Sequence, residues 1–130
     1  MKQLNIVWRD HGTYDVNKLW NKTEDLKTHR IYLHKIIHNL DKDLWTIFIN
    51  GKAKYITPNQ VIKNPYLSTH DFCKIMNSDL SYPIIIYNSD GDLDVLDGLH
   101  RLAKSVILKR KTIKVKCVSN DILLQCKIKK

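Results

Sequence analysis

Residues 97 to 101 bring together side chains that could hold and process a phosphate. The stretch reads Asp97-Gly98-Leu99-His100-Arg101. Arginine offers a planar, permanently charged guanidinium to phosphate oxygens. Histidine can donate a hydrogen bond or move a proton near neutral pH, and an aspartate can act as a base or bind Mg²⁺. The stretch therefore predicts an anion site, with His100 and Asp97 as candidate catalytic residues.

The surrounding pattern predicts that a strand delivers these residues to the start of a helix. Residues 84–86 are apolar and β-branched, and the turn at 88–92 predicts a hairpin with a second strand at 93–96. From Leu99 onward the apolar residues have helical spacing. The first turn of a helix has unpaired N–H groups and a positive dipole end, and a glycine there lets an anion approach closely. We expect Gly98 and the following N–H groups, including that of Leu99, to hold a phosphate.

An alternative without a ligand explains only part of this stretch. Asp97 could cap the helix, which contributes about 1 kcal/mol. Capping leaves His100 and Arg101 unexplained, because a cation at a helix N-terminus costs about 0.3–1 kcal/mol unless a negative group lies beside it. That group could be Asp97 or a bound phosphate. Lys104 follows one turn later and could extend the phosphate site or simply face solvent.

The stretch resembles the turn of the ParB/sulfiredoxin superfamily, in which a strand leads into a G-x-H-R turn and a helix. Two further segments are similar to that family: Ile56 to Ile62, with Pro58, and Tyr82-Pro83-Ile84. The resemblance covers residues 54–125. It implies a nucleoside triphosphate or diphosphate with Mg²⁺ as the ligand, and phosphoryl-transfer or phosphodiester-cleaving chemistry.

The chain also departs from each branch of that family. Sulfiredoxins have a nucleophilic cysteine where this chain has Leu99, so we exclude the sulfiredoxin reaction. ParB clamps continue into a helix-turn-helix domain, for which we expect no room before Lys130. The free serine kinases use a carboxylate base, for which Asp79, Asp97 and Glu24 are candidates. Asp79 and His70 could reach the same cleft, although surface capping or plain exposure competes with that role.

Metal-binding patterns do not fit the sequence. Residues 90–94 alternate acids as a calcium loop does, but Val95 and Arg101 stand where that loop needs glycine and glutamate, so we predict a hairpin turn. The cysteines form no C-x-x-C pair, and we predict no structural metal and reduced thiols. Cys117 shares a predicted strand face with Ile113 and Val115, which predicts a core position.

Charge is distributed unevenly along the chain. The formal net charge is +9, and residues 101–130 hold ten basic residues against one acidic residue, so all of that charge lies there. A basic segment attracts polyanions. The alternative function is therefore a non-catalytic nucleic-acid-binding module, with these candidate residues: Lys109, Arg110, Lys111, Lys114 and Lys116. A solvated lysine face in a protein from an AT-rich genome is the competing interpretation.

We predict a single α+β domain over residues 1–130. Residues 54–125 would form a ParB/sulfiredoxin-like core, a small mixed sheet with flanking helices, and residues 1–53 an N-terminal helical extension packed on it. Expected helices follow Asp15, Pro58 and Ser119 and cover 33–40 and 70–76, although residues 31–33 could instead begin as a strand. Expected strands are a hairpin around Asn50-Gly51 and a strand at 112–118 with Lys114 and Lys116 outward. The three tryptophans are predicted to be core.

The composition and the N-terminal residues indicate where the protein is located and which partners to expect. The chain has 130 residues with 43% hydrophobic content, and Met1 to Asn5 precede no apolar stretch. We therefore expect no signal peptide, no membrane partner and a reducing cytoplasmic location, which also fits a virus- or phage-encoded protein in a host cell. The oligomeric state is open, and a degenerate family member kept as an assembly part is a third possibility.

Overall fold

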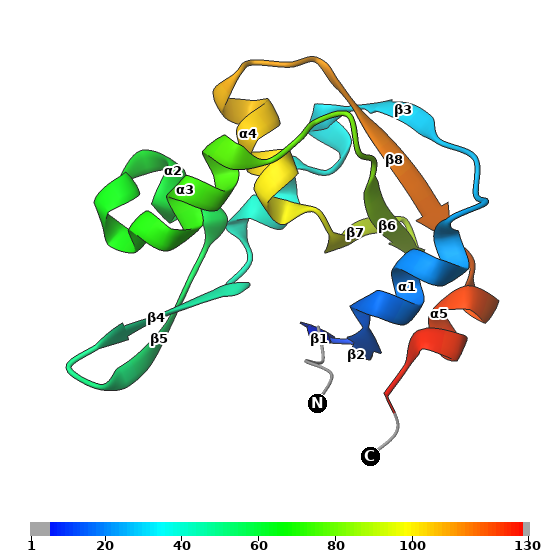
Figure 1. The fold of residues 1–130 in the computed structure, drawn as a ribbon, viewed down its shortest axis with the longest axis horizontal. Coiled ribbons are helices and arrows are strands. Elements are labelled where there is room, and N and C mark those ends of the chain that lie inside the picture. Colours follow the sequence, from blue (N-terminus) through cyan, green and yellow to red (C-terminus); the bar gives the residue numbers. More distant parts are fainter. Residues whose placement is uncertain (1–5, 129–130) are drawn as a thin grey trace.

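The structure is a computed structural model that describes residues 6–128. The expectations about Met1 to Asn5 and about Lys129 and Lys130 lie outside these residues. The chain is mixed α+β, with small sheets and five α-helices among the described residues (Figure 1). The strands are β1 (Ile6–Arg9), β2 (Gly12–Asp15), β3 (His29–Tyr32), β4 (Trp45–Ile49), β5 (Lys52–Ile56), β6 (Ile84–Ser89), β7 (Asp92–Asp97) and β8 (Thr112–Val118). The helices are α1 (Val16–Thr23), α2 (Pro58–Lys63), α3 (Thr69–Asn77), α4 (Leu99–Ile107) and α5 (Asn120–Cys126).

A four-stranded mixed sheet organises the molecule, with strand order β3-β8-β6-β7. β6 and β7 form an antiparallel hairpin, and α4 then crosses over so that β8 lies parallel to β6. The turn between β6 and β7 has positive φ angles at Asp90 and Gly91, which confirms the hairpin predicted there. This topology places the end of β7 and the start of α4 at one edge of the sheet.

The sheet buries a separate apolar cluster on each face. Ile84, Ile86 and Val95 point into the larger cluster, whereas Ile85 and Leu96 point into the smaller one. Because successive side chains of a strand alternate between faces, a strand covered on both sides reads as a continuous apolar run. Figure 1 shows α2, α3 and α4 on one side of the sheet and α1 and α5 on the other.

Two separate hairpins flank this sheet. β1 pairs with β2 near the N-terminus, and β4 pairs with β5 in a hairpin that projects from the body (Figure 1). Asn50 and Gly51 both have positive φ, as a two-residue hairpin turn requires, so that prediction is confirmed. The two hairpins lie on either side of the β7–α4 turn and form two walls of a cleft beside it.

Most predicted helix starts are confirmed by their caps. Asp15 accepts a hydrogen bond from the N–H of Lys18 at the start of α1, and Ser119 caps α5 in the same way. Thr57 and Gln60 form a reciprocal capping box at α2, with Pro58 in the first turn. Ser68 caps α3. These polar residues fix where each helix begins.

The predicted N-terminal helical extension is only partly helical. α1 is present, but the helix predicted at 33–40 is wrong, because β3 is followed by two 3₁₀ turns at Leu33–Lys35 and Ile37–Asp41. β3 pairs with β8, so residues before 54 contribute a strand to the central sheet. The domain division at residue 53 stays a prediction. No helix of residues 6–128 is long and apolar enough to cross a membrane.

Three core assignments are also wrong. Trp8 and Trp20 are exposed, at 63% and 44%, whereas Trp45 is buried as predicted. Cys117 is exposed despite sharing a strand face with Ile113 and Val115. The larger cluster covers that face only as far as Val115, and Val118 belongs to the cluster on the opposite face. Alternation along β8 therefore predicts the side of each residue but not how far the covering helices extend.

Candidate functional site

The turn between β7 and α4 has the geometry expected of an anion site. Gly98 is the N-cap of α4, with φ of 110° in the left-handed region. A Cβ atom there would lie 2.3 Å from Cγ2 of Ile84, so packing as well as backbone conformation requires glycine. The prediction that Asp97 caps the helix is wrong, because α4 has no side-chain cap.

The N-terminal amides of α4 are therefore available. Leu102 N–H donates to the Gly98 carbonyl at 2.9 Å, which begins the helical hydrogen-bond ladder. Among the hydrogen bonds of residues 6–128, none uses the N–H groups of Leu99, His100 or Arg101. Three unpaired donors at the positive end of a helix dipole form a site that favours negative charge.

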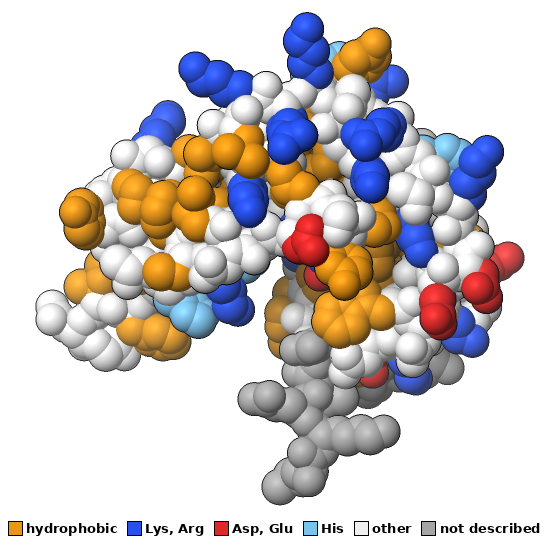
Figure 2. All heavy atoms as spheres, turned by 45° about the horizontal axis from the view of Figure 1, so that its top comes forward, with side chains coloured by type: hydrophobic (Ala, Val, Ile, Leu, Met, Phe, Trp, Pro, Cys, Tyr) orange, Lys and Arg blue, Asp and Glu red, His pale blue; other side chains and the backbone are white. Residues whose placement is uncertain are grey.

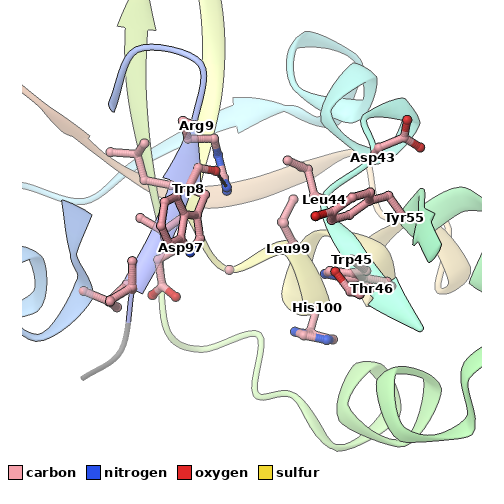
Figure 3. Close-up of a pocket in the computed structure, with 15 residues that line it drawn as sticks. Trp8, Arg9, Asp43, Leu44, Trp45, Thr46, Tyr55, Asp97, Leu99 and His100 are labelled. Atoms are coloured by element: carbon pink, nitrogen blue, oxygen red, sulfur yellow. Dashed lines mark hydrogen bonds between the residues drawn. The ribbon is translucent and has the colours of Figure 1, made fainter. Parts of the chain in front are cut away.

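The start of α4 lies at the wall of a cleft of about 660 Å³ between the two hairpins (Figure 3). Asp97, Gly98, Leu99 and His100 line it from the β7–α4 turn. The other walls come from three strands, which contribute chiefly Trp8 and Arg9 of β1, Trp45 and Thr46 of β4, and Tyr55 of β5. Figure 3 shows Trp8 and Tyr55 on opposite sides of this space. The cleft is thus lined by aromatic rings, two carboxylates and one guanidinium.

Three groups contact His100, and of these only Trp45 also lines the cleft. Its Nε2 lies 3.0 Å from Oδ1 of Asp71 on α3, and its ring stacks on Trp45 with centroids 4.6 Å apart. The Ser78 hydroxyl lies 3.5 Å from its carbonyl oxygen. Burial lowers the pKa of His100 below its ordinary value, and the nearby Asp71 carboxylate opposes that shift. The imidazole is therefore favoured in its neutral form.

Arg101 does not share this cleft, so the prediction that imidazole and guanidinium face one pocket is wrong. Its guanidinium donates to the Pro83 carbonyl at 2.6 Å and to Oδ2 of Asp97 at 3.2 Å. It lines a neighbouring cavity of about 290 Å³ together with Trp20 and Lys116. Residues 100 and 101 leave the first turn of a helix about 100° apart, which sends adjacent side chains to different faces. Asp97 alone of this set borders both cavities.

The remaining candidate residues lie away from the cleft. Lys104 donates from Nζ to the Ser78 carbonyl at 2.7 Å, beyond the end of α3. Asp79 is exposed and accepts from Ser81 N–H at 2.9 Å, and the bonds from Ser81 lower the pKa of its carboxyl group. His70 and Glu24 are exposed and do not line the cleft. Asp79 thus takes the local turn role that competed with catalysis.

The basic residues predicted for nucleic acid divide into two groups. Lys109, Arg110 and Lys111 are exposed where α4 leads into β8. Lys116 is not directed outward as predicted, because its Nζ donates to the Thr23 and Glu24 carbonyls at the end of α1, at 2.9 and 3.0 Å. A lysine there satisfies terminal carbonyls and the negative dipole end. Figure 2 shows Lys and Arg side chains spread over the face that contains the top of Figure 1.

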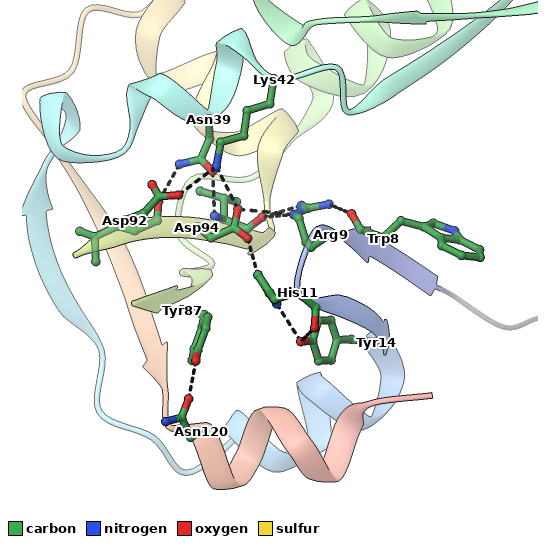
Figure 4. Close-up of polar contacts among 12 residues, drawn as sticks. Trp8, Arg9, His11, Tyr14, Asn39, Lys42, Tyr87, Asp92, Asp94 and Asn120 are labelled. Atoms are coloured by element: carbon green, nitrogen blue, oxygen red, sulfur yellow. Dashed lines mark hydrogen bonds and ion pairs between the residues drawn. The ribbon is translucent and has the colours of Figure 1, made fainter. Parts of the chain in front are cut away.

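A second cluster of charged groups, the Asp94 cluster, comprises Asp94, Arg9, His11, Lys42 and Tyr14 (Figure 4). Oδ2 of the buried Asp94 lies 2.7 Å from Nε2 of His11, and the Tyr14 hydroxyl lies 2.7 Å from Nδ1 of the same ring. Oδ1 of Asp94 lies 3.4 Å from Lys42 Nζ and 3.6 Å from Arg9 Nε. Burial lowers the pKa of Arg9 and raises that of Tyr14.

The Asp94 cluster fastens the cleft wall to the sheet. Arg9 also donates from Nε to the Val95 carbonyl at 3.0 Å, which ties β1 to β7. Buried Asn39 accepts from Val95 N–H at 3.0 Å and donates to the Leu93 carbonyl at 2.9 Å. No buried side-chain nitrogen or oxygen within residues 6–128 lacks a hydrogen-bond partner. We conclude that this cluster is structural and positions the wall that carries Trp8.

Sequence reasoning missed Asp71, Trp8, Arg9 and Asp94. The only available signal for Asp71 was its place three residues after the Ser68 cap, where an acid suits the dipole of α3. The contact of Asp71 with His100 joins residues 29 positions apart, and that of Arg9 with Val95 joins residues 86 apart. Such pairings depend on tertiary structure and leave no local pattern.

The sequence matches no protein-family model, and no curated protein or solved structure matches it. Function is therefore inferred from the geometry of the cleft.

Proposed function

We propose that the cleft between the two hairpins binds a nucleotide, or another phosphorylated small molecule, with a phosphate at the N-terminus of α4. The observation that carries this proposal is the left-handed Gly98, followed by the unpaired N–H groups of Leu99 and His100, two residues that line the cleft. Phosphates bind such helix ends because several donors and a positive dipole end converge on one point. The side chain of His100 lies on the same wall.

The size and lining of the cleft support a nucleotide over free phosphate. Its volume of about 660 Å³ lies within the range of cavities that bind small organic ligands. Trp8 and Tyr55 are 63% and 68% exposed although both line the cleft. Exposed aromatic faces stack on nucleobases, at about 1–3 kcal/mol for each base. One ligand with a planar ring and a phosphate would use both features.

The charges of the cleft favour a nucleotide that carries Mg²⁺. Asp43 and Asp97 line the cleft with Arg9, which is already paired with Asp94. Asp97 is itself paired with Arg101, so Asp43 is the carboxylate that repels a bare polyphosphate. Residues 6–128 contain no group of three or more His, Cys, Asp or Glu side chains that could hold a metal alone. Mg²⁺ commonly uses one or two carboxylates plus the phosphates of its ligand, and either Asp43 or Asp97 could supply one carboxylate.

The family resemblance points the same way. The Asp97-to-Arg101 stretch resembles the ParB/sulfiredoxin turn, and the strand, glycine turn and helix of that motif correspond to β7, Gly98 and α4. We propose the ParB-like fold on this basis. Fold alone does not determine function, so the cleft residues carry the functional proposal.

Ligand-induced stabilisation with a charged wall variant tests this proposal. A nucleotide at one hundred times its Kd should stabilise the protein by about 2.7 kcal/mol, and at one fixed concentration the stabilisation should be larger with Mg²⁺ than without. Thr46→Glu adds a carboxylate to the cleft wall and should weaken binding at least tenfold. Ile49→Glu, at the tip of the same hairpin, is the matched control and should bind normally. Equal binding by both variants, or no stabilisation by any nucleotide tested, would contradict the proposal.

A second candidate function is nucleic-acid binding through the exposed residues Lys109, Arg110 and Lys111, where α4 leads into β8. Replacing all three by Gln should weaken binding to duplex DNA uniformly across sequences and reduce the salt slope by about 3. Lys116→Met is the control, because that lysine already contacts α1. An unchanged salt slope in the triple variant would exclude this surface.

A further inference from the structure

We propose that His100 accepts a proton from the attacking water in the cleft, and that Asp71 is the positioning residue that orients its ring for this step. The inference rests on the proposed function, since it requires a phosphorylated ligand at the start of α4. It adds an activity, hydrolysis of a phosphoric anhydride or ester, and it transfers the role of base from Asp97 and Asp79 to an imidazole.

Asp71 is itself held in one orientation. Its Oδ2 accepts a hydrogen bond from the Ser68 hydroxyl at 2.7 Å, and its N–H lies 3.3 Å from the same hydroxyl at the start of α3. Its Oδ1 lies 3.0 Å from Nε2 of His100. Both carboxylate oxygens therefore have fixed partners, so α3 presents Asp71 to α4 in a defined position.

This contact determines which nitrogen of His100 carries the proton. An ionised carboxylate only accepts hydrogen bonds, so Nε2 is the donor and carries the hydrogen. In the neutral ring Nδ1 then has a lone pair, and no hydrogen bond of residues 6–128 uses it. A carboxylate that fixes the tautomer of a histidine is the arrangement by which triad enzymes prepare an imidazole as a base.

The surroundings keep this base neutral and rigid. The Trp45 ring covers one face of the imidazole at an interplanar angle of 14°. Asp71, His70 and Lys74 face it from α3; burial lowers its pKa most, Asp71 opposes that shift, and Lys74 and His70 add to it. A neutral ring at neutral pH can accept a proton at once, whereas a charged ring could not.

The proposed reaction is the hydrolysis of a phosphoric anhydride. The oxygen of a water molecule forms a bond to the terminal phosphorus of a nucleoside triphosphate, and the bond from that phosphorus to the bridging oxygen breaks. The proton of the water moves to Nδ1 of His100, and the electron pair of the broken bond leaves with the diphosphate. The N–H groups of Leu99 and His100 stabilise the charge on phosphoryl oxygens. His100 then returns its proton to solvent.

The tautomer can be measured without any activity. Nitrogen-15 NMR of the imidazole should show Nε2 protonated and Nδ1 unprotonated in wild type at neutral pH, and Asp71→Asn should abolish this preference. Asp92→Asn is the matched control, because it removes a carboxylate 2.7 Å from Nε2 of His38, outside the cleft. A His100 tautomer that is unchanged in Asp71→Asn would overturn the positioning role.

Turnover then tests the reaction, with release of inorganic phosphate from Mg²⁺–nucleoside triphosphates as the readout. His100→Ala should lower kcat at least about 100-fold, and Asp71→Asn should shift the acidic limb of the pH–rate profile in parallel with the NMR titration. A wild type that binds nucleotide but releases no phosphate, or an Asp71→Asn variant with the wild-type profile, overturns this inference alone. A wild type that binds no nucleotide overturns the proposed function as well.

Discussion

The Asp94 cluster and the β7–α4 turn contain the same residue types but differ in how many of their polar groups are paired within the protein. In the Asp94 cluster, an aspartate, an arginine, a lysine and a histidine are paired with one another and largely withdrawn from solvent. At the turn, the histidine and the arginine separate into different cavities, and backbone N–H groups stay unpaired beside an open cleft. Mutual pairing is typical of a structural cluster, whereas unpaired donors are typical of a binding site.

The Asp94 cluster should give the largest loss of stability when broken. Asp94→Ala leaves Arg9 with a buried, unpaired charge beside Lys42, which should cost about 3–5 kcal/mol. Urea denaturation measures the change in the free energy of unfolding. A loss below about 1 kcal/mol would mean that the cluster is not structural, and the comparison with the turn would fail.

The turn should be broken most strongly by Gly98→Ala. The left-handed backbone and the steric contact with Ile84 together should lower the free energy of unfolding by about 2–4 kcal/mol. Gly91→Ala is the control, since Gly91 also has positive φ but a Cβ there meets nothing within 4 Å. The difference between the two denaturation midpoints isolates the contact with Ile84. Equal losses would show that the backbone conformation alone requires glycine.

Arg101→Ala tests whether the smaller cavity, which Arg101 lines, is separate from the cleft that is proposed to bind the ligand. Losing two side-chain hydrogen bonds, one of them to a carboxylate, should cost about 1–3 kcal/mol of stability. Nucleotide affinity should change by less than about threefold, because the guanidinium faces the smaller cavity. Calorimetric titration measures the affinity. A tenfold or larger loss of nucleotide affinity would show that the Arg101 guanidinium contributes to the phosphate site, as the sequence alone predicted.

His100 should add a small pH dependence to stability. Its folded pKa lies below the ordinary value of 6.5, so the unfolded state binds the proton more readily. Stability from this group is therefore present above 6.5 and is lost as pH falls toward the folded pKa. His100→Asn should flatten the curve of unfolding free energy against pH in that window, as urea denaturation at a series of pH values would measure. A steeper curve in His100→Asn would reverse the assigned sign.

Local sequence signals predicted the elements well, and tertiary contacts account for what they missed. Asn50-Gly51, Pro58, Ser119 and the apolar run before Asp90 each determine their own turn, cap or strand within a few residues. The location of the candidate site at residues 97–100 could be predicted for the same reason. Its walls could not, because Trp8 and Tyr55 come from separate hairpins that only the folded chain brings together. Lys116 looked free because nothing near it in sequence indicates the end of α1.

The place of β8 in the sheet has a consequence for biosynthesis. Among the described strands, β3 pairs only with β8, yet the ribosome makes β8 about eighty residues later. Until then β3 exposes an unsatisfied backbone edge, and β6 has a neighbour on one side only. The central sheet therefore stays incomplete until β8 is synthesised. We expect a chaperone to bind an intermediate that ends before residue 112.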